Sequence, residues 1–309
     1  MLNAIIIGCG DIGIRVGLRL QQQRYQVTAV VRSIESATNL ESFAFNTVIL
    51  DLDQSSATLP SIPSGGLIFY FAPPTEDGEQ DLRMKSFLGA LKSKSANPVR
   101  IVYISTTAVY ADSKGAWINE QAAIQPSNLR GKRRLDAEQQ LIEFQRQHPV
   151  NISILRVSGI YSANRLPFRQ IKARQAILQL EIAPYSNRIH ADDLAKVCIA
   201  AALNTHKPTA TFNVSDGNPG SISQYFKEVA LTFNLQPPPE ISWEDAQKTL
   251  SPGMLSYLRE SKRIDNRLMK HELGVAISYP TLTLGLKQCA AELKQKQPNT
   301  AYRTKINRK

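Results

Sequence analysis

The feature that most constrains this chain is a glycine-rich turn between a short apolar segment and an amphipathic one. Residues 4–7 are all apolar, and Gly8, Gly10 and Gly13 follow them in G-x-G-x-x-G spacing. Apolar side chains then recur among Arg and Gln, and a second apolar run spans residues 27–31. This order predicts a strand, a tight turn, a helix and a second strand within about thirty residues, as in the βαβ unit of dinucleotide-binding proteins.

Each glycine has a separate physical role in such a unit. Gly8 lets the chain turn off the strand, Gly10 lets a pyrophosphate approach the backbone, and Gly13 allows the helix to pack on the strand. The N-terminus of the helix offers free N–H groups and a partial positive charge to the phosphates. We therefore expect Gly8, Gly10, Asp11, Ile12 and Gly13 to contact the cofactor. The alternative is a tight turn in another α/β protein with no ligand.

The residues that end the second apolar run indicate which dinucleotide is bound. An acidic residue in this position bonds the ribose 2′-hydroxyl of NAD. Here the run ends in Arg32 and Ser33, and residues 27–34 contain no acid. A guanidinium and a hydroxyl suit the extra phosphate of NADP, so we expect NADP(H), with NAD as the second option. The alternative for Arg32 is a solvated surface side chain.

Length and composition indicate an ordinary soluble protein. A chain of 309 residues, 42% of them hydrophobic, is long enough for one large α/β domain and a smaller one. No apolar run approaches the roughly 18 residues of a membrane span, and no basic segment precedes the first strand as in a secretory signal. Cys9, Cys198 and Cys289 lie far apart, which is typical of free thiols in a reducing compartment. We expect a cytoplasmic protein without membrane association.

The net charge of +11 is concentrated partly near the end of the chain. From residue 286 onward, seven basic residues and one acidic residue give +6, which leaves +5 for the rest. We expect residues 289–309 to form a disordered, solvated basic tail. The alternative is an arm that touches RNA or an anionic surface weakly. The charge therefore does not indicate a nucleic-acid partner.

Further apolar runs alternate with amphipathic segments along the first half of the chain. Near-continuous apolar runs are typical of strands that are covered on both faces, and the alternation predicts an α/β fold with a Rossmann-type, doubly wound parallel sheet. We expect an NAD(P)-binding domain over residues 1–165 and a smaller, substrate-side subdomain mainly over residues 166–288, with residues near 190–215 returning to the first domain. The apolar runs are residues 47–50, 66–71, 99–104 and 151–155, and the helical segments include 79–91 and 134–144.

Ligands of such sheets bind outside the carboxyl ends of the strands. Asp51, Ala72 and Ser105 follow or end predicted strands, and we expect them to contact the cofactor. Thr106 is expected to face the substrate or the cofactor. The alternative for Thr106 is a hydroxyl that caps the backbone at the strand end.

Several segments resemble motifs of the extended short-chain dehydrogenases/reductases, the NAD-dependent epimerase/dehydratase family. Their order and spacing fit from residue 1 to about residue 288. The resemblance implies an NAD(P)-dependent oxidoreductase or epimerase-like enzyme that acts on a carbonyl or carbinol. The matching segments are residues 104–110 (ISTTAVY, for SS-x-x-VYG), 154–161 (ILRVSGIY, for ILR-x-x-GIYGPG), 188–195 (RIHADDLA, for IHVDDLA), 212–217 (FNVSDG, for YNVSDG), and 261–266 with 273–280 (for SKR-x-x-N…LG…YP).

Two departures from the family pattern concern its chemistry. The usual glycine spacing is G-x-x-G-x-x-G, and the catalytic Tyr-x-x-x-Lys is absent here. When residues 135–138 are aligned with KL-x-AE, Arg130 stands at the Tyr position and Arg134 at the Lys position. This pattern resembles the atypical extended subgroup that includes the bacterial YeeZ-like proteins. In the family the Tyr moves the proton, which a guanidinium cannot do because it does not titrate near neutral pH.

Other residues are candidates for the missing roles. We expect Arg134 to bond the nicotinamide ribose in place of the Lys and Thr106 to donate to a substrate oxygen. Tyr110 and Tyr161 are the nearest candidates for a surrogate acid, with packing as the alternative for Tyr110. His190 is either a catalytic or a structural histidine. The loss of the Tyr and Lys also supports a second function, a non-catalytic NADP(H)-binding redox sensor or regulatory protein.

The basic residues around the Tyr position suggest the charge of the substrate. Arg130, Lys132, Arg133 and Arg134 would bind a small anionic molecule that carries a phosphate or carboxylate, or would simply form a solvated helix start. The Asp-Glu pair that supports dehydration in the family is absent after Thr106, so dehydration by that route is not expected. No His, Cys and Asp residues have metal-binding spacing, and we expect no metal.

Overall fold

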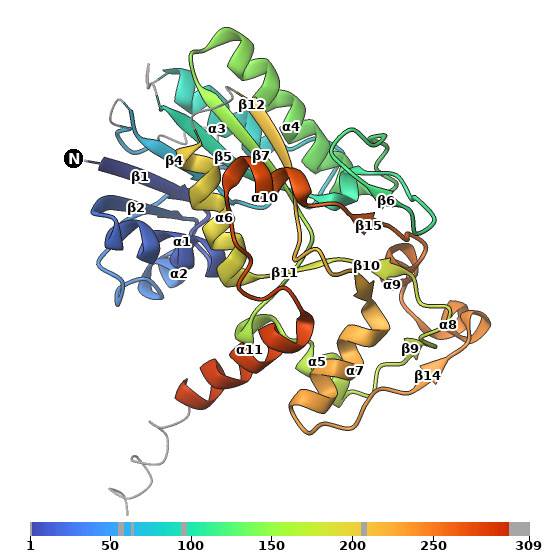
Figure 1. Ribbon diagram of the computed structural model, residues 1–309. Helices are drawn as coiled ribbons and strands as arrows, with labels where there is room; N and C mark the ends of the chain where they lie inside the picture. Colours follow the sequence, from blue (N-terminus) through green and yellow to red (C-terminus); the bar gives the residue numbers. More distant parts are fainter. Residues whose placement is uncertain (1, 55–58, 63–64, 94–97, 205–208, 297–309) are drawn as a thin grey trace, which may run out of the picture.

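A parallel sheet forms the centre of the computed structural model, which describes residues 2–54, 59–62, 65–93, 98–204 and 209–296 (Figure 1). Its seven strands lie in the order β12-β7-β5-β4-β1-β2-β3, and the order reverses at β1. The predicted Rossmann-type, doubly wound α/β sheet is therefore confirmed. The strands are β1 (Leu2–Ile7), β2 (Tyr25–Val31), β3 (Asn46–Ile49), β4 (Leu67–Tyr70), β5 (Arg100–Thr106), β7 (Asn151–Val157) and β12 (Thr209–Val214).

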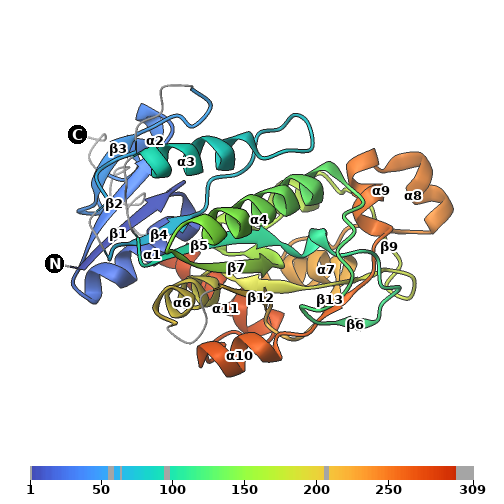
Figure 2. The same cartoon turned by 90° about the horizontal axis from the view of Figure 1, so that it is seen from above.

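Helices cover both faces of the sheet (Figure 2). On one face lie α1 (Asp11–Gln22), α6 (Ala191–Leu203) and α10 (Arg267–Leu273), and on the other lie α3 (Leu82–Ser93) and α4 (Leu129–Gln147). Strand β1 shows why residues 4–7 are all apolar. Ile6 packs into the core on the α1 side, whereas Ile5 and Ile7 pack into the core on the α3 side.

Helix α4 begins earlier than the sequence predicts because Asn128 caps it. The Asn128 side chain accepts a hydrogen bond from the backbone N–H of Gly131 at 2.9 Å. A Cβ on Gly131 would lie 2.4 Å from the carbonyl oxygen of Ala108, so the helix can approach η1 (Thr107–Val109) this closely only with glycine. The first turn of α4 is thereby held beside the end of β5.

The smaller elements gather mainly beyond the carboxyl ends of β5, β7 and β12 (Figure 1). The parallel pairing of β15 with β6 brings the chain near residue 263 back to the loop that follows β5. Paired short strands are β6 (Trp117–Ile118) with β15 (Arg263–Ile264), β8 (Gly159–Tyr161) with β11 (Arg188–His190), β9 (Ile177–Leu178) with β14 (Glu240–Ile241), and β10 (Tyr185–Ser186) with β13 (Gly220–Ser221). The remaining helices are α2 (Ile34–Thr38), η2 (Ala163–Arg165), α5 (Phe168–Lys172), α7 (Ile222–Thr232), α8 (Trp243–Thr249), α9 (Pro252–Leu258) and α11 (Leu282–Lys296).

Helix α11 corrects the expected start of the basic tail. The helix includes residues 289–296, so the prediction of a disordered tail from residue 289 is wrong for that stretch. Leu286 and Cys289 are fully buried, and Leu282 and Leu293 pack against the same apolar cluster. Burial of these four apolar side chains on one face thus stabilises the helix, while its lysines lie on the other face. The rest of the predicted tail, residues 297–309, lies outside the described residues.

A buried polar network lies under the carboxyl ends of β5, β7 and β12. Arg156 donates to the carboxylate of Glu138, with a shortest distance of 2.7 Å, and to the hydroxyl of Tyr110 at 3.0 Å. Tyr110 in turn donates to the side-chain oxygen of Asn213 at 2.7 Å, and the Ser105 hydroxyl donates to Glu138. The network ties α4 to three neighbouring strands.

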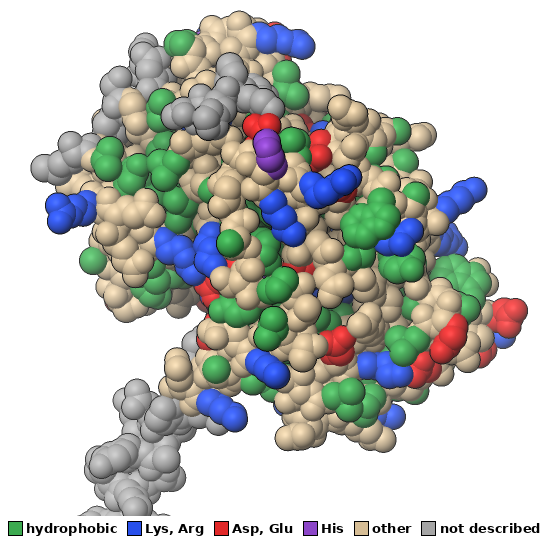
Figure 3. Space-filling model, viewed as in Figure 1, with side chains coloured by type: hydrophobic (Ala, Val, Ile, Leu, Met, Phe, Trp, Pro, Cys, Tyr) green, Lys and Arg blue, Asp and Glu red, His purple; other side chains and the backbone are tan. Residues whose placement is uncertain are grey.

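The described helices and the face shown in Figure 3 bear on two kinds of partner, a membrane and a nucleic acid. Among the described residues, no helix has the length and apolar character needed to cross a bilayer. On the face shown in Figure 3, the described Lys and Arg side chains are scattered and interleaved with acidic and hydrophobic ones. That face therefore lacks the basic stripe by which many proteins bind nucleic acids.

We predict that the Arg156→Met variant lowers the free energy of unfolding by about 3–5 kcal/mol, because it leaves the Glu138 carboxylate buried without its cation. Urea denaturation measures the change. The matched control is Arg146→Met, which removes an exposed partner of Glu143 on the same helix and should cost less than about 1 kcal/mol. Equal losses in the two variants would contradict the role given to the buried pair.

Candidate functional site

A cavity of about 780 Å³ runs along the carboxyl ends of β1, β2, β3 and β4. The starts of α3 and α4 close it on the other side. Five of the residues that the sequence predicts to bind the cofactor line this cavity: Gly8, Arg32, Asp51, Ala72 and Arg134. We call it the larger cavity.

The glycine-rich turn has the geometry that a pyrophosphate requires. Gly8 has a φ of +85°, and a Cβ there would lie 2.5 Å from the backbone nitrogen of Ala72. A Cβ on Gly10 would meet nothing within 4 Å, whereas one on Gly13 would lie 3.0 Å from Ile6. No side chain caps α1, so its first N–H groups are open to a ligand. The turn therefore fits a dinucleotide.

The side chains of Asp11 and Ile12 are committed to the protein. Asp11 accepts hydrogen bonds from Arg15, Ser162 and Arg165, and Ile12 is buried in the core. Their predicted contacts with the cofactor can thus come only from the backbone of the first turn of α1.

Arg32 is available to a ligand at the end of β2. Its side chain is 65% exposed, and its nearest carboxylate oxygen, on Asp53, is 4.0 Å away. Asp53 is held more closely by Arg83, whose two nitrogens lie 2.7 and 2.6 Å from its oxygens. The hydrogen bonds from Arg83 lower the pKa of Asp53. Ser33 instead caps α2 by accepting from the N–H of Ser36, so it is less available than Arg32.

A second cavity, of about 420 Å³, lies beyond the end of β5, and we call it the smaller cavity. Thr106 and Lys262 line it, α9 contributes Tyr257 to its wall, and Arg130 lines both cavities. The Thr106 hydroxyl oxygen accepts from the N–H of Ala108 at 3.2 Å, which leaves its own O–H to donate elsewhere. Thr106 therefore caps η1 and can still contact a ligand.

Two predicted site residues belong to the buried network instead. Tyr110 is 1% exposed, and its hydroxyl lies between Arg156 and Asn213. Burial raises the pKa of Tyr110, and the residue lines neither cavity. Its role as a surrogate acid stays a prediction, and its contacts favour the packing alternative. Ser105 is 3% exposed, and its hydroxyl donates to Glu138. Its contact with the cofactor also stays a prediction. Ser105, on β5, bonds to α4, whereas Tyr110, directly after η1, bonds to β7 and β12.

Tyr161, the other candidate acid, is fully buried. Its ring packs edge-on against His190 and Tyr225, and burial raises its pKa. It lines neither cavity. Tyr161 therefore has a packing role in this structure, and its role as a surrogate acid stays a prediction.

The basic residues at the start of α4 differ in what they bind. Lys132 pairs with Glu79 at 2.6 Å, and Arg133 donates to two backbone carbonyls of the β4–α3 loop. Arg134 donates to the carbonyl oxygen of Ile104 at 2.9 Å, at the end of β5, and lines the larger cavity. Its expected contact with the nicotinamide ribose stays a prediction. The side chain of Arg130 makes no hydrogen bond or ion pair to any described residue, although it borders both cavities.

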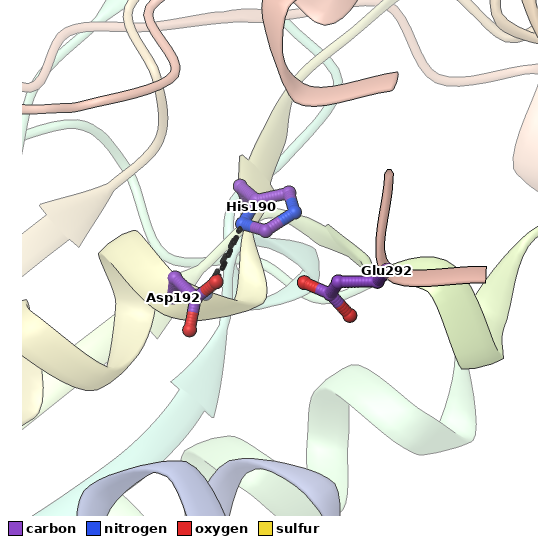
Figure 4. A group of neighbouring side chains, drawn as sticks. All are labelled: His190, Asp192 and Glu292. Atoms are coloured by element: carbon purple, nitrogen blue, oxygen red, sulfur yellow. Dashed lines mark hydrogen bonds and ion pairs between the residues drawn. The ribbon is translucent and has the colours of Figure 1, made fainter. Parts of the chain in front are cut away.

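His190 belongs to a cluster of charged residues away from the two cavities. Asp192 and Glu292 lie close to it, and its Nδ1 is 3.7 Å from a carboxylate oxygen of Asp192 (Figure 4). The same nitrogen accepts from the backbone N–H of Asp192 at 3.2 Å. Arg15 donates to Asp192 at 2.8 Å and to Glu292 at 3.5 Å, so both carboxylates have a cation as partner. His190 is fully buried, and burial lowers its pKa. The cluster is an ion-pair junction of α1, α6 and α11, with a structural histidine.

Sequence reasoning missed an ion pair in the smaller cavity. Lys262 donates to Glu260 at 2.8 Å and to the carbonyl oxygen of Tyr110 at 3.0 Å. The other oxygen of Glu260 accepts from Ser127 and Asn128, which precede α4. Lys262 lies in the SKR segment, but only the pairing of β15 with β6 brings it to the cavity. Its position in a family motif was the available signal.

The sequence and the fold both match a known family. Residues 4–215 match the model of the NAD dependent epimerase/dehydratase family. The chain belongs to this family. No curated protein matches the sequence. The family assignment confirms the predicted resemblance, whereas membership of the YeeZ-like subgroup stays a prediction.

Three solved structures are similar in fold to this epimerase/dehydratase family member. A functionally unknown conserved protein from Silicibacter pomeroyi is 26% identical with a TM-score of 0.82, over 95% of this chain and 100% of that one. A protein described as an NAD-dependent epimerase/dehydratase from Methylobacillus flagellatus is 22% identical, with a TM-score of 0.68 over 95% and 99%. UDP-glucose 4-epimerase from Bifidobacterium longum, solved with NAD⁺ and UDP, is 16% identical, with a TM-score of 0.72 over 96% and 99%.

We predict that alanine has different effects at Gly10 and at Gly8, lowering cofactor affinity at the first and fold stability at the second. Gly10→Ala should weaken NADP⁺ binding on the order of tenfold, because its Cβ enters the space left for the pyrophosphate, and should change stability by less than about 0.5 kcal/mol. Gly8→Ala should destabilise the fold by about 2 kcal/mol or more, because of the backbone clash and the positive φ. Calorimetric titration and urea denaturation measure the two effects. Unchanged NADP⁺ affinity in folded Gly10→Ala would place the pyrophosphate elsewhere.

Proposed function

We propose that this family member is an NADP(H)-dependent oxidoreductase or epimerase-like enzyme that acts on a carbonyl or carbinol of a small molecule. The observation that carries the proposal is that the two cavities share Arg130 as a lining residue. Thr106 lines the smaller cavity, and Arg130 lines both. An extended dinucleotide in the larger cavity would reach the smaller one at this point. When bound, the dinucleotide supplies the hydride or accepts it.

Different residues in and beside the larger cavity bind different parts of this cofactor. The open space at Gly10 and the uncapped N-terminus of α1 suit the pyrophosphate. Arg32 supplies a cation for the 2′-phosphate, because Asp53 is already neutralised by Arg83. This arrangement favours NADP(H) over NAD(H).

The residues around the smaller cavity bind and orient the substrate. The Thr106 O–H donates to the substrate oxygen that becomes, or ceases to be, a carbonyl. Arg134, anchored on Ile104, holds the cofactor ribose in place of the family lysine. Tyr257 of α9 also lines this cavity. The chain thus retains a site for orientation even though the family tyrosine is replaced by Arg130.

A second candidate function is a non-catalytic NADP(H)-binding redox sensor or regulatory protein. It is favoured by the burial of Tyr110 and Tyr161, neither of which lines the larger or the smaller cavity. A sensor would bind the reduced and oxidised cofactors with different affinities and would show no turnover. We also propose that the protein works in the cytoplasm, since its three cysteines are buried free thiols.

We predict that NADPH is oxidised in the presence of one or more members of a panel of carbonyl compounds and nucleotide sugars, read at the nicotinamide absorbance. Thr106→Val should then lower turnover by on the order of 10²–10³ and leave NADPH affinity nearly unchanged, since the hydroxyl faces the substrate cavity. The affinity is the control for correct folding. Turnover that is insensitive to the substitution would mean that the chemistry takes place elsewhere. No turnover with any substrate would favour the sensor.

We predict that Arg32→Asp reduces NADP(H) affinity relative to NAD(H) by roughly tenfold to a hundredfold, because it replaces a phosphate partner of about 1.5–3 kcal/mol with a repulsive charge. Calorimetric titration of both cofactors measures the ratio. Arg146→Asp, the same change in charge at an exposed site on α4, should leave the ratio unchanged. An unchanged ratio in Arg32→Asp would remove Arg32 from the cofactor site.

A further inference from the structure

We propose that the smaller cavity binds a small anionic group of the substrate, a carboxylate or a phosphate, through Arg130 and Lys262. The proposal rests on the proposed function, because it names the substrate class of the same site. It places the anion beside Thr106, within a cavity of about 420 Å³. The substrate would therefore carry its charge close to the reacting carbon, as a short oxo or hydroxy acid does.

The guanidinium of Arg130 has no stabilising partner among the described residues. Its side chain makes no hydrogen bond or ion pair with any described residue and is exposed to the cavities. It also lies in the first turn of α4, where the helix dipole disfavours a cation and no acidic residue compensates for it. Lys132, in the same turn, has a carboxylate partner in Glu79. An unpaired guanidinium that lowers helix stability and faces a cavity is suited to a ligand with two oxygens.

Lys262 adds a second cation to the smaller cavity, and it is paired with the carboxylate of Glu260. Both oxygens of Glu260 accept hydrogen bonds, one from Lys262 and the other from Ser127 and Asn128. The Glu260 charge therefore balances Lys262 and leaves that of Arg130 in excess in the cavity. Lys262 uses two of its three N–H groups, on Glu260 and on the Tyr110 carbonyl, and the third is available to a ligand.

The backbone brings the two cations to the same place as Thr106. Lys262 bonds the carbonyl of Tyr110, four residues beyond Thr106. Gly131 lets the first turn of α4 approach the carbonyl of Ala108, which holds Arg130 against the same loop. Thr106, Arg130 and Lys262 all line the one cavity. A carboxylate or phosphate on the cations thus leaves an adjacent substrate oxygen near the Thr106 hydroxyl.

The test is a titration of the full-length protein saturated with NADP⁺, which fills the 2′-phosphate and pyrophosphate sites. Oxamate is the carboxylate probe, inorganic phosphate is the phosphate probe, and uncharged oxamide is the control ligand. We expect one of the anions to bind beside NADP⁺, as measured by calorimetry, and the tighter of the two identifies the group. Oxamide should not bind.

Variants of α4 assign the binding to Arg130. Arg130→Gln should weaken the anion roughly tenfold to a hundredfold, and Arg130→Lys should give an intermediate loss because it keeps the charge without the two-pronged geometry. Lys132→Gln removes the same charge from the same turn, but Lys132 pairs with Glu79 and lines neither cavity. The affinity of this variant for the anion should therefore equal that of the unmodified protein. Arg130 is exposed, and thermal unfolding checks that each variant is folded.

Three results would overturn the proposal while the dinucleotide still binds. These are no binding of either anion, equal losses in Arg130→Gln and Lys132→Gln, and displacement of NADP⁺ by the anion, which would assign Arg130 to the cofactor phosphates. A protein that binds neither NADP⁺ nor NAD⁺ would contradict the proposed function itself and remove the proposal with it.

Discussion

The ion pair between Arg156 and Glu138, buried under the carboxyl ends of three strands, is the interaction on which the site depends. Two desolvated charges stabilise a fold only if their remaining hydrogen bonds are satisfied, and here Ser105, Tyr110 and Asn213 surround the pair. The pair joins α4 to β7, and its neighbours join it to β5 and β12. Helix α4 borders both cavities, and β5 and β7 border the smaller one. The network that fixes the helix therefore also fixes how the two cavities lie relative to each other.

The loss of the family Tyr and Lys changes how α4 is used. Arg134 reaches the end of β5 with a longer, forked side chain, which bonds a backbone carbonyl and lies over the Tyr103 ring. Arg130 cannot exchange a proton near neutral pH, but it brings a permanent charge to the border of both cavities. Under our proposal, the substitution replaces proton transfer with anion recognition. Thr106 is the element of the family pattern that retains both its position and a hydrogen to donate.

The fold could be predicted from the sequence because parallel strands covered on both faces leave long apolar runs and because each turn glycine meets a local steric demand. The side-chain roles were harder to predict. Ser105 and Tyr110 follow a strand end, where polar residues often meet ligands, but their direction depends on Glu138 and Arg156 from other elements. Lys262 enters the cavity through a pairing of two short strands far apart in the chain. Helix α11 was missed because its apolar face is narrow.

The most direct test of the account is a crystal structure of the protein soaked with NADP⁺. The account predicts electron density along the larger cavity, with the pyrophosphate at Gly10 and the 2′-phosphate within hydrogen-bonding distance of Arg32. The nicotinamide ring should lie at the opening of the smaller cavity, next to Thr106. A dinucleotide bound outside the larger cavity, or with its nicotinamide ring turned away from Thr106, would contradict it.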